Sequence, residues 1–476
     1  MKKYDAVVVG SGPNGYAAGI RLLQQGLSVL MLEANADTGG GLRSSELTLP
    51  GFIHDVGSTV HPLAYASPYL SILPLEQFGL EWVHPEAPLA HPLEGGNAVL
   101  VHQDLEKTAS QLGKDKQAYL DLMAPSVSNW DKIAPDFLGP LRFPRHPFQL
   151  ARFGLNAVQP LSLLNKLYFK EERTKALLAG LAAHGMLPLD HWVSSGIAMV
   201  LGTLAHKVGW PFPRGGAQSL SDALDQYFRS MGGEVRTQTK VRSISDLPPC
   251  RIMMLDTAPQ LLLEMGGIRL PWWYKTQLKA YRYGQGVFKM DWALSEPIPF
   301  INADCNKAAT IHIGASYDEI AVSEKAMWKG KHSQRPYVLL VQSSVFDQSR
   351  APSGKHTAWA YCHVPAYSTE DMSEVIENQI ERFAPGFRDT IIGRHTMNTR
   401  AMQSLSANYI GGDINAGAQT LSQLFTRPVY RLTPYRTPLQ GVYLCSSGTP
   451  PGGGVHGMCG FHAAETALKD LKKKRI

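Results

Sequence analysis

Cysteine is scarce in this chain. Its 476 residues include five cysteines, which show no Cys-x-x-Cys pair and no spacing typical of a metal site. An odd number of scattered cysteines argues against a complete disulfide framework, and the lack of a close pair excludes a dithiol redox centre. We therefore expect no bound metal and a reducing compartment, the cytoplasm.

Long hydrophobic runs are also lacking. The best candidate, SSGIAMVLGTLA at 194–205, is shorter than the roughly 18 residues that span a bilayer, and glycine and polar residues interrupt it. The basic start MKKYDAVVVG precedes only a short apolar run that ends in a glycine turn, which predicts a strand rather than a leader peptide. Two interpretations of the basic tail, Lys472 to Arg475, stay open: a solvated helix end or a peripheral contact with an anionic membrane.

Charge is mild and scattered. The net charge is +6, and no basic stripe with interleaved aromatic residues occurs, so we expect no nucleic-acid partner. With 44% hydrophobic residues, the chain is long enough for two cores. This composition is typical of a soluble enzyme, and it leaves the oligomeric state open.

Glycine, by contrast, is abundant, and its first cluster lies in VVVGSGPNGYAAGIRLLQQGLSVLMLE at 7–33. Gly10, Gly12 and Gly15 follow an apolar run and open a helical segment, and a second apolar run ends at Glu33. Such glycines permit a tight turn and the close approach of a pyrophosphate to the helix N-terminus, while the acid accepts hydrogen bonds from a ribose. The pattern predicts an α/β fold with a Rossmann-like domain for a dinucleotide that lacks a 2′-phosphate.

Two more glycine clusters follow. Gly39, Gly40 and Gly41 come soon after Glu33 and lead into LTLPGFIHDVGSTVHP at 47–62. Near the C-terminus, GVYLCSSGTPPGGGVHGMCGFHAAETALKDL at 441–471 predicts a strand, a glycine-rich turn and a helix. Both turns present backbone N–H groups to an electron-rich ligand.

These motifs resemble the flavoprotein superfamily of amine oxidases and carotenoid desaturases, and in particular its phytoene-desaturase-like branch. The matching positions include Pro50, Gly51, Phe52, His54, Asp55, Gly57 and Ser58, and further similar islands lie at 213–224, 291–300, 343–365 and 411–428. Ser446 and Pro450 depart from the glycine and histidine of the branch.

The resemblance implies FAD as the cofactor, held in a glutathione-reductase-type flavoprotein fold. The C-terminal turn would lie under the flavin, with the helix N-terminus near the atoms that gain charge on reduction. The cofactor-binding residues that it implies are Gly10, Gly12, Pro13, Asn14, Gly15, Glu33, Ala34, Gly40, Gly41, Leu42, Arg43, Gly57, Ser58, Val241, Gly448, Gly453, Gly454, Val455, His456 and Met458.

A discontinuous organisation follows from the order of the motifs. We expect an FAD-binding domain from residues 1–84, 206–265 and 429–476, and an α+β substrate domain with a helical cap from 85–205 and 266–428. LSLLNKLYF and TKALLAGLAAH predict cap helices, and QGVFKMDWAL and YVLLVQSSVF predict strands of a sheet that floors the pocket. A strand is expected at 234–244, after which the usual hairpin of the family is missing.

The chain has one complete GxGxxG unit and no redox cysteine pair, which argues against a disulfide reductase reduced by a nicotinamide. The resemblance instead implies an FAD-dependent oxidoreductase that desaturates or oxidises a hydrophobic or amphipathic small molecule. Hydride would pass to flavin N5, and electrons would leave to oxygen or a quinone. Two alternatives stay open: an isomerase or saturase of a polyene-like substrate, and a flavin-binding interaction protein with little turnover.

Candidate catalytic residues are few. His456, inside the C-terminal turn, and His61 suit proton transfer near neutral pH, with packing or loop hydrogen bonding as the alternative role. The aromatic stretch 272–292, with Lys275, Arg282 and Lys289, fits either an apolar pocket with a cationic rim or plain core. A lysine near N5 matters in amine oxidases, but no motif aligns Lys289 with it.

Overall fold

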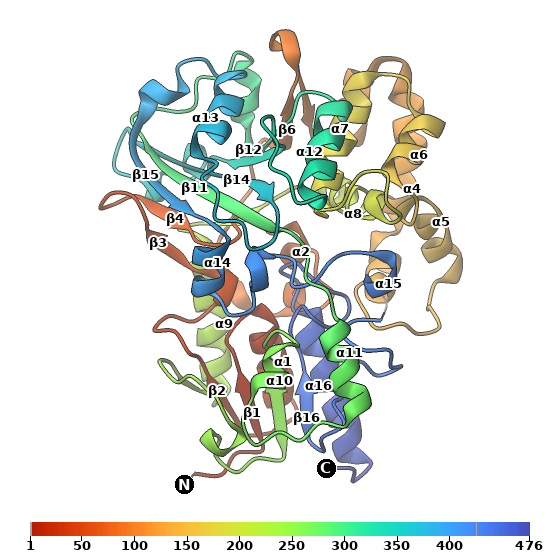
Figure 1. Cartoon of the computed structure of the whole chain (residues 1–476), viewed down its shortest axis with the longest axis vertical. Helices are drawn as coiled ribbons and strands as arrows, with labels where there is room; N and C mark the ends of the chain where they lie inside the picture. Colours follow the sequence, from red (N-terminus) through yellow and green to blue (C-terminus); the bar gives the residue numbers. More distant parts are fainter. Residues whose placement is uncertain (1, 425) are drawn as a thin grey trace.

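A parallel five-stranded sheet lies in the lower half of the molecule (Figure 1), in a computed structural model that describes residues 2–424 and 426–476. In spatial order its strands are β16 (Val442–Leu444), β10 (Ile252–Leu255), β1 (Ala6–Val9), β2 (Val29–Leu32) and β9 (Glu234–Arg236). All four pairings are parallel. Every residue of β1, β2, β10 and β16 is buried, as continuous apolar runs in a sheet covered on both faces require.

Helices cover both faces of this sheet. One face carries α1 (Pro13–Leu23), α9 (Ala217–Ser230) and α16 (Met458–Lys472), and the other carries α10 (Leu261–Glu264) and α11 (Trp272–Ala280). Glycine allows α1 and α16 to pack closely, because a Cβ at Gly460 would lie 1.8 Å from the carbonyl oxygen of Asn14. The expected units at both ends of the chain, strand–turn–helix, are thus confirmed.

A mixed seven-stranded sheet forms the upper left of Figure 1. Its order is β15 (Ile391–Met397), β11 (Gly286–Leu294), β14 (His356–Val364), β13 (Val338–Val341), β12 (Ala308–Ile313), β6 (Ala87–Pro92) and β7 (Ala98–Val101). Only β6 and β12 pair in parallel within it. Helix α13 (Ser373–Glu381) covers one face, where Trp292 and Ile376 belong to the same buried cluster. The opposite face looks toward the first sheet.

A helical group lies at the upper right of Figure 1. It consists of α3 (Leu105–Ala109), α4 (Lys116–Phe137), α5 (Pro147–Ala157), α6 (Leu161–Tyr168), α7 (Glu172–Ala183), α8 (Ser194–Lys207) and α12 (Tyr317–Trp328). The short helices α2 (Pro62–Tyr65), α14 (Thr399–Leu405) and α15 (Leu421–Leu424) complete the set. The expected helices at 161–169 and 174–184 are α6 and α7. Within the ranges described, no helix has the length and apolarity needed to cross a membrane.

The expected strand at 234–244 is wrong in length. Strand β9 ends at Arg236, and Gln238 has φ of +51°, a left-handed conformation that interrupts an extended strand. The segment nevertheless stays beside the end of β2, because the amide of Thr239 donates to the carbonyl of Glu33. The chain then reaches β10 through a single 3₁₀ turn at Ile244–Asp246, without a hairpin in the described residues between them.

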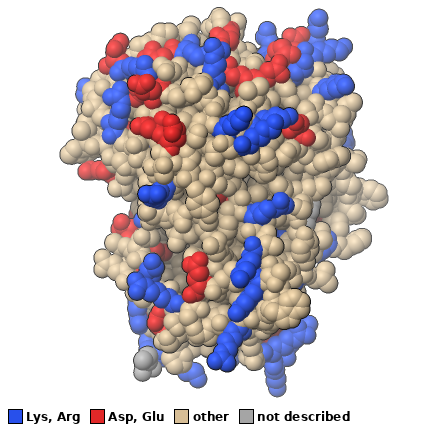
Figure 2. Space-filling model, viewed as in Figure 1, with Lys and Arg blue, Asp and Glu red and all other residues tan. Residues whose placement is uncertain are grey.

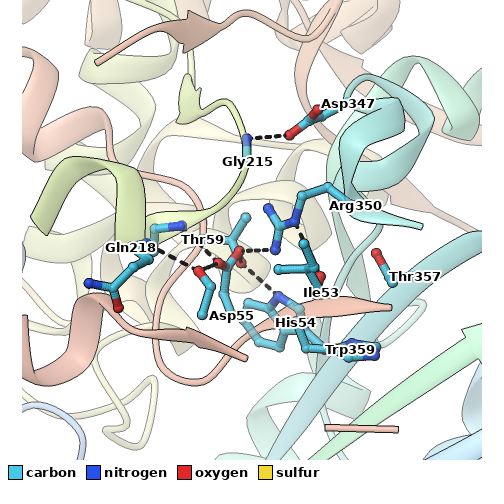
Figure 3. A network of polar contacts seen from close by, with 12 residues as sticks. Ile53, His54, Asp55, Thr59, Gly215, Gln218, Asp347, Arg350, Thr357 and Trp359 are labelled. Carbon is cyan, nitrogen blue, oxygen red and sulfur yellow. Dashed lines mark hydrogen bonds and ion pairs between the residues drawn. The ribbon is translucent and has the colours of Figure 1, made fainter. Parts of the chain in front are cut away.

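A buried ion pair joins the parts of the molecule around the cavity (Figure 3). Asp55 ends β4 (Ile53–Asp55), which pairs with β3 (Ser44–Glu46), and its Oδ2 lies 2.8 Å from Nη2 of Arg350 in the loop after β13. Both side chains are at most 1% exposed. The Asp55 carboxylate also accepts hydrogen bonds from the Ser44 and Thr59 hydroxyls and from the amide of Ala217 at the start of α9.

The same loops make a second contact, since Asp347 accepts a hydrogen bond of 2.7 Å from the amide of Gly215. Two of the islands that resemble the flavoprotein superfamily, 213–224 and 343–365, are therefore held against the 47–62 turn. Burial favours the neutral acid, but the Arg350 guanidinium and the donated hydrogen bonds lower the pKa of Asp55 to about 2.

Replacing Arg350 with methionine should leave a buried carboxylate without its countercharge and lower the free energy of unfolding by about 3–5 kcal/mol. Arg229→Met, which breaks an exposed pair with Asp225, should cost under about 1 kcal/mol. Urea unfolding of both variants measures the contrast, and equal losses for the two variants would contradict the role of the Asp55–Arg350 pair.

The same pair should make stability depend on pH. Because the folded pKa of Asp55 lies below its unfolded value, the stabilisation by the Asp55 carboxylate is present above about pH 4 and is lost as pH falls toward 2.

Candidate functional site

A cavity of about 500 Å³ lies between the two sheets. Its lower end is formed by the turn after β1, the end of β2 and the loops that follow, which is the carboxyl edge where open parallel sheets bind ligands. Its upper end is formed by strands of the seven-stranded sheet and by α8. The cavity therefore connects the Rossmann-like unit with the sheet that was expected to floor a pocket.

Most residues that the resemblance implies for the cofactor line this cavity. These are Gly10, Gly12, Pro13, Asn14, Glu33, Ala34, Gly40, Gly41, Gly57, Ser58, Val241, Gly453, Gly454 and Val455. The structure thus brings the three glycine clusters together, although the third lies some 400 residues after the first two in the chain. Ser447 of the C-terminal turn also lines the cavity, although the sequence does not predict it as a site residue. Its hydroxyl accepts a hydrogen bond of 3.2 Å from the side-chain Nδ2 of Asn14.

The other implied residues lie behind the cavity wall. Leu42 and Met458 are buried in the main hydrophobic core. Arg43 donates to the carbonyls of Gly40 and Leu405, and so fixes the second glycine loop from behind. Gly448 packs on Pro259, which a Cβ would approach to 2.5 Å. Gly15 and His456, treated below, complete this group.

Glu33 is held in place by four donors. Its Oε2 accepts hydrogen bonds from the amide and hydroxyl of Ser11, and its Oε1 accepts from the amide and side chain of Asn35. The side chain is only 6% exposed, yet it borders the cavity. A fixed carboxylate at this position suits a ribose hydroxyl and would repel a 2′-phosphate, and this role of Glu33 stays a prediction.

A second carboxylate lies at the lower end of the cavity and is not among the residues predicted from the sequence. Asp256 directly follows β10, and its Oδ2 accepts a 3.0 Å hydrogen bond from the amide of Gly15 in the first turn of α1. A Cβ on Gly12 would lie 2.6 Å from the same oxygen. Burial, with a smaller contribution from Glu33, raises the pKa of Asp256 to about 7, so the folded chain holds its proton up to near neutrality.

The two candidate histidines lie in different surroundings. His61 borders the cavity, and both of its ring nitrogens are buried without a hydrogen-bond partner among the described residues. His456 does not border the cavity, and its Nδ1 accepts from the amide of Met458. Burial lowers the pKa of each to about 4, so both rings are neutral at pH 7. His456 is therefore held by the loop through Nδ1 while its Nε2 is unpartnered among the described residues, whereas neither nitrogen of His61 has a partner there.

The upper end of the cavity is mainly apolar. It is lined by Ile197, Val200, Leu201, Trp210, Val287, Leu339, Val341, Trp359, Tyr361 and Met402, together with Lys289, Thr310 and His184. Lys289 is 1% exposed, forms a buried ion pair with Asp291, and lies 5.1 Å from the centre of the Trp359 ring. His184 is 2.9 Å from His312 through their Nε2 atoms, and burial lowers the pKa of His184 to about 3.

The aromatic stretch 272–292 does not form the pocket as a whole. Helix α11 lies on the far face of the five-stranded sheet, where Trp272 is 79% exposed and Tyr274 is core. Of this stretch only Val287 and Lys289, both on β11, line the cavity. The pocket interpretation therefore holds for β11, while the helical part is core and surface.

The residues present fit a dinucleotide. Seven glycines border the cavity and leave room for a ligand at its lower end, and at Gly40 a Cβ would come 3.2 Å from the Cα of Gly12. The unpartnered nitrogens of His61 and the buried Thr257 hydroxyl supply polar groups that a ligand can satisfy. Within the part of the chain described, no group of three or more His, Cys, Asp or Glu is placed to hold a metal, and all five cysteines are free.

Asp256→Asn should stabilise the ligand-free protein increasingly as pH rises. The folded pKa of Asp256 lies above its unfolded value, so its favourable contribution is present below about pH 4 and is lost as pH rises through 7. Asparagine retains an acceptor for the Gly15 amide without the charge. The advantage of the variant should grow by at most about 1.4 kcal/mol per pH unit between pH 5 and 7, and then level off.

Urea unfolding of wild type and variant at pH 5, 6, 7 and 8 measures this difference, in which the titration of the buried histidines cancels. Stability curves that stay parallel across this range would contradict a raised pKa at Asp256.

Comparison with known proteins agrees with this geometry. Residues 8–71 match the model of the NAD(P)-binding Rossmann-like domain. The chain is 26% identical to rat (Rattus norvegicus) pyridine nucleotide-disulfide oxidoreductase domain-containing protein 2, over 99% of this chain and 94% of the other. It is 22% identical to the lycopene-forming phytoene desaturase of Pseudescherichia vulneris, over 98% and 99% of the two chains.

Among solved structures, the fold is similar to that of cyclohexylamine oxidase from Brevibacterium oxydans IH-35A, with a TM-score of 0.62 and 14% identity over 99% of this chain and 100% of the other. The resemblance to phytoene desaturases and the assignment to oxidoreductases expected from the sequence are thereby confirmed. The expected fold class is confirmed as well, and the likeness to an amine oxidase is one of fold.

Proposed function

We propose that the protein is an FAD-dependent oxidoreductase that desaturates or oxidises a hydrophobic or amphipathic small molecule. The observation that carries the proposal is that one cavity has glycine-rich turns and a fixed carboxylate at one end and an apolar wall at the other. The phytoene desaturase relative supports an unsaturated hydrocarbon as the substrate type.

The chain's own groups would hold the cofactor at three places. The N-terminus of α1 and the backbone of Gly40 and Gly41 suit the diphosphate, and Glu33 suits the adenosine ribose. The turn at 453–455 and the start of α16 suit the flavin ring. When bound, FAD supplies the hydride-accepting chemistry, which the side chains of the cavity do not.

The substrate would occupy the upper end. Trp359 and Tyr361 stand on β14 as a stacked pair with ring centroids 5.9 Å apart, and they present flat apolar surface to the cavity. The Trp359 indole is fixed by its N–H, which donates to Thr59 at 2.8 Å, and Thr59 in turn donates to Asp55 (Figure 3). Lys289, neutralised by Asp291, adds one polar point to this wall. This composition favours an apolar substrate with at most a small polar group.

The absence of a second dinucleotide unit and of a cysteine pair supports oxygen or a quinone, rather than a nicotinamide, as the partner in electron transfer. A saturase or isomerase that works from reduced flavin uses the same cavity, and a flavin-binding protein with little turnover is the alternative outside catalysis. These alternatives differ in what reduces the bound flavin.

Gly12→Ala with Gly15→Ala should abolish flavin retention. A Cβ at Gly15 would meet the Gly10 carbonyl oxygen at 2.2 Å, and one at Gly12 would meet Asp256 at 2.6 Å, so the cradle must distort. Absorbance at about 450 nm in the purified protein reports bound flavin. Gly154→Ala, in helix α5 with nothing within 4 Å of the added Cβ, is the matched control and should keep its flavin. Full flavin content in the double variant would refute the cradle assignment.

Anaerobic mixing distinguishes the three functions. Apolar unsaturated substrates should bleach the band at about 450 nm faster than NADH or NADPH does. Faster bleaching by the nicotinamides would favour a saturase or isomerase. No bleaching by any of a broad set of apolar and amine compounds would favour the interaction protein.

A further inference from the structure

The segment between Asp136 and Glu171 contains no acidic residue. Within it stand Arg142, Arg145, Arg152, Lys166 and Lys170. By contrast, Figure 2 shows acidic and basic side chains interspersed over the upper part of one face. The segment includes α5 and α6, which lie at the right-hand edge of Figure 1.

The same segment exposes large apolar side chains. The exposed fractions are 64% for Leu141, 88% for Phe143, 85% for Phe148, 70% for Leu155 and 63% for Leu167. Single exposed apolar residues are ordinary, but a contiguous group of this kind marks an interaction surface.

The exposed side chains share one face on each helix. On α5, Phe148, Ala151, Arg152 and Leu155 are exposed at helical spacing, while Phe153 and Ala157 are buried against the core. On α6, Leu163, Lys166 and Leu167 are exposed, while Leu161 and Leu164 are buried. Apolar side chains therefore cover both faces of each helix, and the cations stand only on the outer one.

The two outer faces are neighbours. The Tyr168 hydroxyl at the end of α6 donates to Oδ1 of Asn156 near the end of α5, at 3.5 Å. The loop that carries Leu141 and Phe143 leads directly into α5. We call the exposed side chains of 141–148, α5 and α6 the apolar–basic face.

We propose that the apolar–basic face docks on an anionic lipid membrane, with its aromatic and aliphatic side chains in the interfacial layer and its cations at the lipid phosphates. Helices that combine exposed Phe and Leu with Arg and Lys bind this way, through buried apolar area together with attraction to anionic lipid. Charge argues for a membrane over a second copy of the chain, because two such faces would bring their cations together.

The position of the face suits the proposed function, on which this further point rests. Helix α5 packs on α8, where a Cβ at Gly196 would lie 3.0 Å from the carbonyl of Ala157. The next turns of α8 supply Ile197, Val200 and Leu201 to the cavity wall. A membrane on the apolar–basic face would therefore lie one helix away from the apolar end of the cavity, where a substrate dissolved in lipid is needed.

Co-sedimentation with vesicles tests the docking. The flavin-loaded wild type should bind vesicles of phosphatidylcholine with about 30% phosphatidylglycerol, and bind pure phosphatidylcholine at least tenfold more weakly. Phe148→Ser with Leu155→Ser should weaken binding to the anionic vesicles at least tenfold, since both side chains are exposed and their loss leaves the core unchanged. Ile72→Ser with Leu432→Ser, which are 73% and 90% exposed elsewhere, is the matched control and should bind as wild type.

The cations are tested in the same way. Arg145→Gln, Arg152→Gln and Lys166→Gln together should weaken binding and reduce its dependence on salt, whereas Lys472→Gln, Lys473→Gln and Lys474→Gln in the basic tail should not. Flavin content at about 450 nm should be unchanged in all four variants, so failure of docking is distinguishable from failure of the cofactor assignment.

Lack of vesicle binding by wild type, or undiminished binding by the Phe148/Leu155 variant, would overturn the proposal. Loss of binding in the tail variant alone would assign the contact to the tail instead. A concentration-dependent dimer that only the Phe148/Leu155 variant breaks, without vesicle binding, would assign the face to a second copy.

Discussion

The buried pair of Asp55 and Arg350 is the contact on which the site depends. It joins the 47–62 turn to the loop after β13. The Asp55 carboxylate also accepts hydrogen bonds from the Ser44 and Thr59 hydroxyls and from the amide at the start of α9. Thr59 in turn fixes the Trp359 indole on the cavity wall. One carboxylate thus holds together elements from both sheets, and the cavity lies between them. A charge buried so deeply is tolerated only because every partner is present, which makes the arrangement cooperative.

The lower end of the cavity, proposed to hold the cofactor, is lined by glycines, which have no side chains. Its glycines leave room for a ligand and let one stretch of backbone approach another. The two carboxylates there, Glu33 and Asp256, are held in place by hydrogen bonds from the protein. Glu33 accepts four hydrogen bonds, whereas Asp256 is held by the amide of Gly15. Burial raises the pKa of Asp256 to about 7, so its negative charge beside the N-terminus of α1 is reduced below neutral pH.

Much of the fold and of the cofactor end could be predicted from the sequence, because local rules govern them. Gly10, Gly12 and Gly15 between two apolar runs predict a strand, a tight turn and a helix, and the glycines of the C-terminal segment predict the same unit. Asp256 could not be found this way, since one acid after an apolar strand has no distinctive pattern until the strand is placed beside α1. Trp359 looks like an ordinary strand residue, and the sequence left Lys289 open between a pocket rim and plain core, so only tertiary pairing shows that both border the cavity. The predicted length of the strand at 234–244 is wrong because the alternation of apolar and polar residues does not reveal a left-handed backbone conformation such as that of Gln238.

The central claim is that the cavity holds FAD, and identification of the cofactor tests it most directly. The protein is purified, heated to release any bound molecule, and the supernatant is analysed by mass. The account predicts FAD at about one molecule per chain, either as isolated or after incubation with FAD. A nicotinamide dinucleotide in its place, or a protein that binds no FAD on reconstitution, would contradict the account.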